Sequence, residues 1–502
     1  MRPENAAEAR AALAGGRPAL VWRRVVADTE TPVGAARKLM QPGRGDFLLE
    51  SVEGGEVRGR YSLLGLDPDL LFRADGARAA INRRWQTNRT AFEECEGDTF
   101  TELHALVEAC RIDTPPALPP ALACLVGYFG YETIGLVEKI PAPRGTGLGL
   151  PDMLFVRPTL ILVFDRLGDE LFCIAPLWPT QGVSPEGAIE TATDRIDCAL
   201  GKLARAAPPA VRTADAPRVE PVAAMASGDF TQMVRRAQEY IAAGDIFQVV
   251  LSQRFTCPFS LPPIALYRAL RRVNPSPFLY FLDLPGFAVV GSSPEILVRV
   301  RDDEVTIRPI AGTRPRGSDP QADRAAEQSL LADPKERAEH LMLLDLGRND
   351  VGRVSAPGSV RVTDSFTVER YSHVMHIVSN VVGTLDPAKG ALDALFAGFP
   401  AGTVSGAPKI RACEIIAELE PDARGPYAGG VGYFAPDGTL DSCIVLRTGV
   451  VKDGTLHVQA GAGIVADSDP RYEQRECEAK AGALFAAARE AYRVAAEPEF
   501  GQ

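Results

Sequence analysis

The sequence lacks the cysteine patterns of a metal site or a disulfide framework. Its nine cysteines are scattered over 502 residues, and no two form a Cys-x-x-Cys pair. An odd number of cysteines without metal-site spacing is typical of free thiols in a reducing compartment. No cysteine lies in a Gly-x-Cys-x-Gly turn, so a cysteine nucleophile is not expected.

An excess of basic charge and long apolar runs are absent as well. The chain has 54 Lys and Arg against 65 Asp and Glu, a net charge of −11, which argues against a nucleic-acid or anionic-membrane partner. No apolar run reaches the roughly 18 residues of a membrane span, and the N-terminal residues are polar, without a signal peptide. We therefore expect a cytoplasmic protein.

The length predicts two domains, because 502 residues exceed what one hydrophobic core usually supports. Residues 203–227 are rich in Ala and Pro and lack apolar periodicity, as is typical of a linker. We expect an N-terminal domain over 1–202, a second domain over 228–490 and a short tail over 491–502.

Short strand-like runs and helical segments alternate irregularly along the chain. Strands are expected over 46–51, 160–165, 246–255, 278–282, 287–290, 295–301, 374–382, 429–434, 442–451 and 455–461, and helices over 230–243, 334–346, 409–419 and 470–495. This order indicates a mixed α/β or α+β fold rather than a doubly wound nucleotide-binding fold.

Two predicted helices begin in the same way and carry carboxylates at the same spacing. Asp333-Pro334 and Asp469-Pro470 each combine an acidic N-cap with proline at the first helical position. Two glutamates three residues apart follow on one face of each helix: Glu336 and Glu339 on the first, Glu473 and Glu476 on the second. With few basic neighbours expected, these faces suit Mg²⁺, although solvated glutamates are the common alternative.

Other chemistry-bearing residues have two interpretations from pattern alone. His376 shares a strand face with valines and is either a satisfied core residue or a general base in a pocket. Arg447 lies in a strand-like run and either points outward or needs a buried partner. Glu476 and Lys480 are spaced to form an ordinary helix ion pair. Gly402–Lys409 fails the Walker spacing and Gly461–Gly463 the dinucleotide fingerprint, but both glycine segments let a small ligand approach the backbone.

Six collinear motifs together resemble the chorismate-utilising enzymes, and among them the anthranilate synthase component I family. The motifs are the segments 244–255, 293–295, 309–313, 345–350, 402–409 and 461–470. The resemblance is specific over about 228–486 and looser over the first 200 residues. It implies antiparallel β-sheets that form a sandwich-like core flanked by helices.

Two positions separate the reactions of this family. Isochorismate and salicylate synthases carry a lysine base at the position of Gln248, which favours ammonia over water as the nucleophile here. Aminodeoxychorismate synthases typically carry a nucleophilic lysine at the position of Ala311. The resemblance thus implies amination of chorismate at C2 with loss of the C4 hydroxyl, then pyruvate elimination to anthranilate, the first step of tryptophan biosynthesis. Aminodeoxychorismate synthase component I and 2-amino-2-deoxyisochorismate synthase remain alternatives, as does a tryptophan-binding subunit without catalysis.

The resemblance also implies roles for individual residues. Glu295 would protonate the departing hydroxyl, His376 would remove the C2 proton, and Thr403 would position the substrate. Glu339 and Glu476 would bind Mg²⁺ directly, with Glu336 and Glu473 acting through water. The residues that would hold the two carboxylates of chorismate are Gly312, Thr313, Tyr427, Arg447, Gly461, Ala462, Gly463 and Lys480.

Regulation and partners follow from the same resemblance. An L-tryptophan feedback site is expected between the two domains at Ser51, Pro277, Phe278 and Leu279. No amidotransferase nucleophile elbow is found in the sequence, so ammonia is expected from a separate glutamine amidotransferase subunit. The expected assembly is a heterotetramer of two large and two small subunits.

Overall fold

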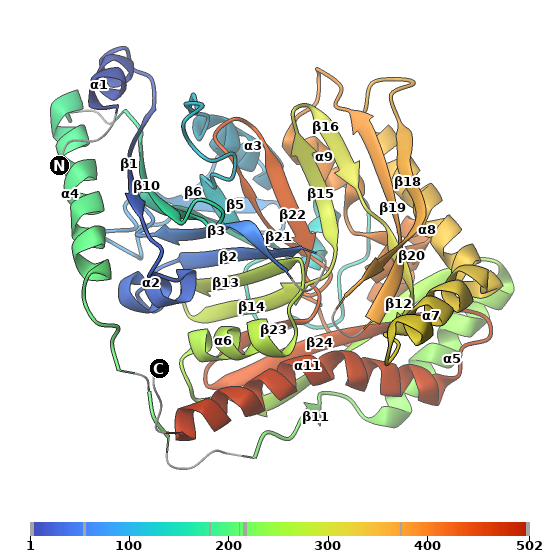
Figure 1. The fold of residues 1–502 in the computed structure, drawn as a ribbon. Helices are drawn as coiled ribbons and strands as arrows, with labels where there is room; N and C mark the ends of the chain where they lie inside the picture. Colours follow the sequence, from blue (N-terminus) through green and yellow to red (C-terminus); the bar gives the residue numbers. More distant parts are fainter. Residues whose placement is uncertain are drawn as a thin grey trace.

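Two large antiparallel sheets, packed face to face, form the centre of the molecule (Figure 1). The computed structural model describes residues 5–53, 57–179, 182–209, 211–213, 218–371 and 374–497. Every strand pairing in it is antiparallel. The expected fold class, antiparallel sheets flanked by helices, is confirmed.

The first sheet has twelve strands, and its order mixes strands from both halves of the chain. The strands are, in order, β1 (Ala19–Val26), β10 (Glu170–Leu177), β9 (Leu160–Asp165), β3 (Val57–Leu66), β2 (Asp46–Glu53), β13 (Phe278–Leu284), β14 (Phe287–Ser293), β23 (Thr448–Lys452), β24 (Thr455–Ile464), β12 (Gln248–Pro258) and β11 (Val222–Ala223), with β20 (Gly406–Ala407) on β12. The two halves meet where Ser51 on β2 pairs with Phe278 on β13.

The second sheet also has twelve strands and crosses between the halves. Its order is β17 (Ile310–Pro315), β19 (Val374–Thr384), β16 (Glu304–Ile307), β15 (Ile296–Arg301), β22 (Leu440–Ile444), β21 (Gly430–Phe434), β7 (Leu125–Phe129), β8 (Met153–Arg157), β4 (Leu70–Asp75), β5 (Arg78–Asn82) and β6 (Glu93–Glu94), with β18 (Arg361–Arg370) on β19. Gly430 on β21 pairs with Phe129 on β7. Neither sheet ends at the predicted 203–227 boundary, because both combine strands from the two halves.

Eleven α-helices lie in the described part of the chain. They are α1 (Ala6–Ala14), α2 (Pro32–Leu39), α3 (Thr99–Ala109), α4 (Pro185–Leu203), α5 (Ser227–Ala243), α6 (Pro263–Val273), α7 (Pro320–Ala332), α8 (Pro334–Gly352), α9 (Ala391–Gly398), α10 (Lys409–Leu419) and α11 (Pro470–Ala496), beside the 3-10 helices η1 (Tyr131–Leu136) and η2 (Gly402–Val404). Helices α5, α6 and α11 pack on the first sheet, and α7, α8 and α9 pack on the second (Figure 1). No described helix is long and apolar enough to cross a membrane.

The space between the sheets is filled by apolar side chains from both. One buried cluster contains Tyr280 and Val289 of the first sheet together with Tyr128 and Val431 of the second. The rings of Tyr128 and Phe287 meet edge to face across the interface, with centroids 5.9 Å apart. Burial of this apolar surface from both halves of the chain holds the sheets together.

Most predicted elements are confirmed, with limits that differ by a few residues. Helix α5 ends at Gly244, whose φ of 84° is the left-handed conformation that glycine adopts readily. Helix α8 continues six residues beyond its expected end at Leu346, to Gly352. Helix α11 ends at Ala496, one residue beyond its expected end, and so includes part of the segment 491–502 that was expected as a tail. All nine cysteines are free thiols, as expected.

One predicted strand is wrong. Residues 442–451 form the ends of two strands, β22 and β23, which lie in different sheets. The chain leaves one sheet after Ile444 and joins the other at Thr448, and Arg447 in between has a φ of 48°. The apolar run is continuous because both strands are buried, so the pattern concealed the break.

Candidate active site

The predicted site residues converge where β12 and β24 of the first sheet face β17 and β19 of the second. The first turns of α8 and α11 lie beside these strands, because α8 packs on β17 and β19 and α11 packs on β24. Both helices begin as predicted: Asp333 accepts hydrogen bonds from the backbone N–H groups of Lys335 and Glu336, and Asp469 accepts one from that of Tyr472. These caps fix where the four glutamates lie.

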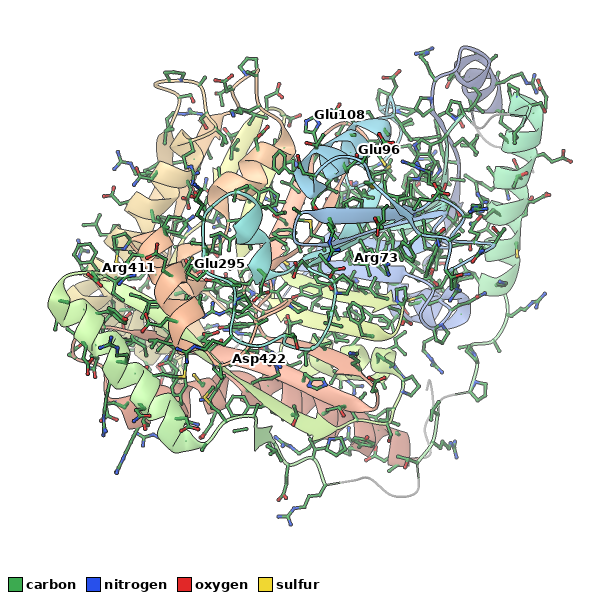
Figure 2. The ribbon with its side chains drawn as sticks, turned by 180° about the vertical axis from the view of Figure 1, so that it is seen from behind. Arg73, Glu96, Glu108, Glu295, Arg411 and Asp422 are labelled. Atoms are coloured by element: carbon green, nitrogen blue, oxygen red, sulfur yellow. The ribbon has the colours of Figure 1, made fainter. Side chains whose placement is uncertain are left out.

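Glu295 is a buried carboxyl group directly before β15. Only 6% of its surface is exposed, and Figure 2 marks its place in the view from behind. The Thr403 hydroxyl on η2 lies 3.1 Å from each of its carboxyl oxygens. Burial raises the pKa of Glu295 to about 8, against the opposing effect of the Thr403 hydrogen bond. Glu295 is therefore mostly protonated at neutral pH and can act as a general acid.

His376 on β19 is held in one orientation. Its Nδ1 lies 2.9 Å from the carbonyl oxygen of Gly312 and 3.1 Å from the Thr313 hydroxyl. Because a carbonyl oxygen can only accept, Nδ1 carries the proton of the neutral ring and Nε2 keeps its lone pair. Burial lowers the pKa of His376 to about 4, so the ring is neutral at physiological pH. A neutral, oriented imidazole is suited to act as a general base.

Gly312 produces this arrangement through a bulge in β17. The pairing of β17 with β19 shifts register between Ala311 and Thr313, and Gly312 has a φ of 69°. An L side chain is strained in that conformation, and a Cβ there would also lie 3.0 Å from Oε2 of Glu336. The bulge directs the Gly312 carbonyl to His376 and brings Thr313 beside it.

Arg447 supplies positive charge beside His376. Burial lowers the pKa of its guanidinium, and Arg447 in turn contributes to the lowered pKa of His376. Among the described residues no carboxylate forms an ion pair with it. A desolvated guanidinium without a protein anion is an anion-binding group. The expectation of a strand arginine is thus corrected, because Arg447 lies in the crossover between the sheets.

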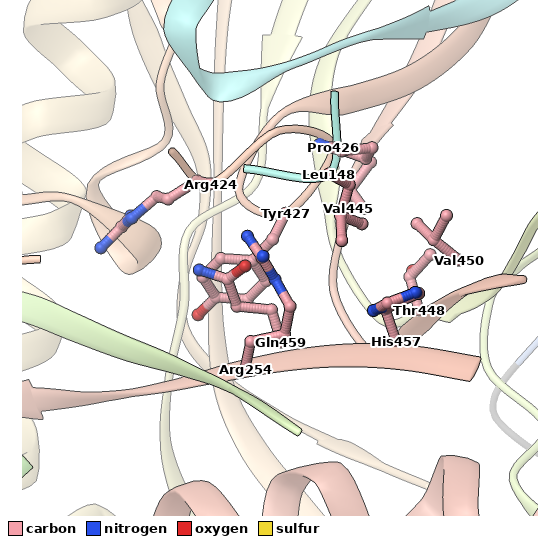
Figure 3. Close-up of a pocket in the computed structure, with 10 residues that line it drawn as sticks. All are labelled: Leu148, Arg254, Arg424, Pro426, Tyr427, Val445, Thr448, Val450, His457 and Gln459. Carbon is pink, nitrogen blue, oxygen red and sulfur yellow. The ribbon is translucent and has the colours of Figure 1, made fainter. Parts of the chain in front are cut away.

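Tyr427 and the glycine segment of β24 form another wall of the site. A Cβ at Gly461 would lie 2.7 Å from the Tyr427 hydroxyl oxygen, and one at Gly463 would lie 2.6 Å from Nε2 of Gln248. Tyr427 and Arg424 are among the residues that line a small cavity of about 20 Å³ (Figure 3). Ala462 between the glycines is fully buried, so its side chain faces the core.

Gln248 is the first residue of β12 and is buried, with 5% of its surface exposed. Its Nε2 donates to Oε1 of Glu339 at 3.2 Å. Its Oε1 is buried and has no hydrogen-bond partner among the described residues. A buried amide oxygen without a partner costs free energy, so this atom is available for a donor group of a ligand.

The expectation of few basic neighbours around the four glutamates is wrong. Arg314 pairs with Glu336 at 2.8 Å and with the cap residue Asp333 at 2.7 Å. Lys480 pairs with Glu476 at 2.7 Å, as the helix spacing predicted, and also donates to the carbonyl oxygen of Gly461 at 2.9 Å. The contact between Arg314 and Glu336 could not be predicted from the sequence, because β17 brings Arg314 to α8 from 22 residues away.

The remaining two glutamates are desolvated. Burial raises the pKa values of Glu339 and Glu473, and each feels the repulsion of the second glutamate on its own helix. Lys480 and Lys335 lower the pKa values of both, so the two helix faces share the same basic neighbours. No group of three His, Cys, Asp or Glu among the described residues is gathered tightly enough to hold a metal ion. Mg²⁺ usually takes only one or two direct carboxylates, so the donor chemistry still fits this ion.

The four residues predicted for the feedback site line a separate cavity between the sheets. Ser51, Pro277, Phe278 and Leu279 border a space of about 870 Å³. Phe278 pairs with Ser51 on one side and with Ser293 on the other. The structure brings these residues together, although they come from both halves of the chain.

Several buried residues that hold the site in place were not predicted from the sequence. Arg424 donates to Glu420 and to the carbonyl oxygens of Val404 and Val250. Val404 directly follows Thr403, and Val250 lies on β12, the strand that begins with Gln248. Lys409 pairs with Asp350 at 2.8 Å and lies outside the site. A charged residue in an apolar segment is the sequence signal for such pairs, but it does not identify the partner.

Two known proteins are similar to this chain over most of its length. The chain is 53% identical over 480 residues to anthranilate synthase component 1 of Cereibacter sphaeroides, covering 95% of each chain. It is 47% identical over 469 residues to anthranilate synthase component 1 of Pseudomonas putida, covering 92% of this chain and 93% of the other.

Solved structures show the same fold. Anthranilate synthase component I from Streptococcus pneumoniae superposes with a TM-score of 0.75 at 36% identity, covering 85% of this chain and 92% of that one. The menaquinone-specific isochorismate synthase from Escherichia coli has a TM-score of 0.70 at 20% identity, covering 95% and 99%, which supports the fold alone. The sequence pattern of the chorismate binding enzymes matches residues 47–486. The chain therefore belongs to the chorismate binding enzyme family and is an enzyme of the chorismate-utilising type.

Proposed function

We propose that this chain is the large subunit of an anthranilate synthase. It would aminate chorismate at C2 with loss of the C4 hydroxyl, and then eliminate pyruvate to give anthranilate. The observation that carries the proposal is that one site contains a protonated Glu295 and a neutral His376 oriented by Gly312. The similarity to proteins named anthranilate synthase component 1 supports it.

The proposed proton transfers match these two protonation states. Ammonia attacks C2 while Glu295 gives its proton to the departing C4 hydroxyl, which leaves as water. His376 then accepts the C2 proton through Nε2, the C3–O bond breaks, and the ring becomes aromatic. The enolpyruvyl group takes up a proton and leaves as pyruvate. An acid or base in such a step contributes about 10²- to 10⁴-fold to the rate.

The choice of ammonia rather than water rests on Gln248. An amide cannot deprotonate water, but the buried Oε1 of Gln248 can accept a hydrogen bond from ammonia. Ala311 offers no amine, which disfavours aminodeoxychorismate synthesis through a covalent intermediate. Amination at C2 is therefore the reaction that the site supports best.

The substrate carboxylates would be held at two places. Arg447 and Tyr427, with the backbone at Gly461 and Gly463, would bind the enolpyruvyl carboxylate, since the guanidinium of Arg447 forms no ion pair with a described carboxylate. Gly312 and Thr313 would bind the ring carboxylate, with Lys480 nearby.

Mg²⁺ is proposed as the cofactor. Glu339 and Glu476 would hold the ion, and Glu336 and Glu473 would complete its surroundings. When bound, the ion would supply positive charge next to the ring carboxylate and withdraw electron density from the ring. Arg314 and Lys480 would have to release Glu336 and Glu476 at least in part, because each pairs with one of them.

Regulation and assembly are also proposed. The cavity at Ser51, Pro277, Phe278 and Leu279 would bind L-tryptophan as a feedback inhibitor, and its mixed aromatic and charged lining suits an amino acid with an indole ring. A separate glutamine amidotransferase would supply ammonia, in a heterotetramer of two large and two small subunits. The designation of the relatives as component 1 supports a partner component.

One assay tests the proposal. The purified chain is given chorismate, MgCl₂ and an ammonium salt at alkaline pH, and the product is identified by fluorescence and mass. Anthranilate is expected, its formation should stop with EDTA, and L-tryptophan should inhibit it. A product aminated para to the ring carboxylate would instead identify aminodeoxychorismate synthase component I. A product aminated at C2 that retains the enolpyruvyl group would identify 2-amino-2-deoxyisochorismate synthase.

A further inference from the structure

The cavity between the sheets and the catalytic residues share one wall. Pro294 and Ile296 line the cavity, and Glu295 lies between them. Ile310 also lines it and begins β17, the strand that carries Gly312 and Thr313. A single chain segment therefore lies between the cavity and the proposed acid, and another lies between the cavity and the residues that orient His376.

Tyr371 contacts both sides of this wall. Its ring meets that of His376 edge to face, with centroids 5.4 Å apart and an interplanar angle of 66°. Tyr371 lines the cavity, and only 8% of its surface is exposed. No other described aromatic ring contacts His376.

The hydroxyl of Tyr371 is connected to charged groups in the cavity wall. It donates to Oε2 of Glu369 at 3.0 Å, and Oε1 of Glu369 accepts from Nη2 of Arg308 at 2.5 Å. Both Glu369 and Arg308 line the cavity. Since Glu369 and Arg308 are charged groups at the cavity surface, a charged ligand there competes directly for them.

We propose that Tyr371 is a positioning residue through which a ligand in this cavity controls His376. The ligand class is an amino acid, and the inference rests on the proposed tryptophan site. A ligand that engages Arg308 or Glu369 releases the Tyr371 hydroxyl, and the ring of Tyr371 then moves against the imidazole. Because Nδ1 of His376 is anchored to Gly312, such a movement changes the direction of Nε2, the proposed base atom.

The test compares tryptophan binding with tryptophan inhibition in the Tyr371→Phe variant. Phenylalanine keeps the ring against His376 but removes the hydrogen bond to Glu369. Binding of L-tryptophan is measured by titration calorimetry, and inhibition is measured as the rate of anthranilate formation relative to the uninhibited rate of the same variant. The matched control is Tyr433→Phe, because Tyr433 lines the same cavity and makes no ring contact with His376 among the described residues.

The two measurements should separate only in Tyr371→Phe. Its binding midpoint should stay within about twofold of wild type, while the factor by which saturating tryptophan slows anthranilate formation should fall at least about tenfold, within the range of allosteric coupling. In wild type and in Tyr433→Phe, saturating tryptophan should slow anthranilate formation to the same extent. Undiminished inhibition of Tyr371→Phe at saturating tryptophan overturns the inference but leaves the proposed tryptophan site intact. Coupling would then pass along β13 and β14 to Glu295. A wild-type chain that makes anthranilate but binds no tryptophan overturns both this inference and the proposed feedback site.

Discussion

The Thr403 hydroxyl lies 3.1 Å from both carboxyl oxygens of Glu295, across 108 residues of sequence. This contact fixes the orientation of a carboxyl group that burial keeps largely protonated. Thr403 is itself held in place, because Arg424 donates to the carbonyl oxygen of the next residue, Val404. The proposed general acid is therefore oriented by one residue and protonated by its surroundings.

Replacement of Glu295 by Gln should lower kcat by about 10²- to 10⁴-fold, the usual contribution of a general acid. The amide has the same shape and still accepts from Thr403, so KM for chorismate should change little. Steady-state anthranilate formation measures both constants. A kcat within a few-fold of wild type would exclude Glu295 as the acid.

The pKa of Glu295 predicts how the rate of anthranilate formation changes at alkaline pH. The acid must be protonated, and burial raises its pKa to about 8, so the rate should decrease as the pH rises above about 8. The rates must be compared at a constant concentration of uncharged ammonia, because ammonium deprotonates in the same range. The Glu295→Gln variant should lack this decrease.

Replacement of His376 by Ala should leave chorismate binding nearly intact and lower anthranilate formation by about 10²- to 10⁴-fold. Amination does not need this base in our proposal, so 2-amino-2-deoxyisochorismate should accumulate and be detectable by mass. The base must be neutral, and its pKa is lowered to about 4. At a constant concentration of uncharged ammonia and at saturating Mg²⁺, protonation of His376 should therefore not lower the wild-type rate until about that pH. Unchanged turnover in the variant would remove His376 from the mechanism.

Replacement of Arg447 by Lys should raise KM for chorismate more than it lowers kcat. Lysine keeps the positive charge but cannot form two parallel hydrogen bonds to a carboxylate, a loss of about 1.5–3 kcal/mol per charged hydrogen bond. Arg493→Lys is the matched control, because Arg493 is an exposed residue that pairs with Glu490 and Glu497 at the far end of α11. Equal KM values in the two variants would show that Arg447 does not bind the substrate.

Replacement of Glu339 by Gln should raise the Mg²⁺ concentration needed for half-maximal activity by about 10- to 100-fold. Glu490→Gln removes a carboxylate from α11 far from the site and should behave as wild type. The pKa of Glu339 is raised, and the ion needs the carboxylate form, so the apparent Mg²⁺ affinity of wild type should weaken as the pH falls. Activity in EDTA equal to that in Mg²⁺ would disprove the metal proposal.

Replacement of Ser51 by Phe should abolish tryptophan inhibition while anthranilate formation continues. Ser51 lines the cavity between the sheets, and a phenyl ring there would occupy part of the space that we assign to the indole. The inhibition curve of the variant is compared with that of wild type. An unchanged inhibition curve would show that tryptophan does not bind in this cavity.

The sequence predicted best what depends on neighbouring residues. The Asp-Pro starts of α8 and α11 and the glutamate spacing were readable, because capping and helical faces involve residues within about four positions. His376 also lies on the strand that was expected. The break at Arg447 was not readable, because two buried strands in different sheets produce one continuous apolar run.

What the sequence determined by itself is the set of chemical groups: four paired carboxylates, a glutamine at 248, an alanine at 311, and one histidine among valines. Tertiary structure decided their states. Glu295 is protonated because residues far away in sequence bury it, Glu336 is paired because β17 brings Arg314 to α8, and His376 is oriented because Gly312 bulges out of β17. Protonation, pairing and orientation depend on desolvation and on contacts between distant segments, and these exist only once both sheets have formed.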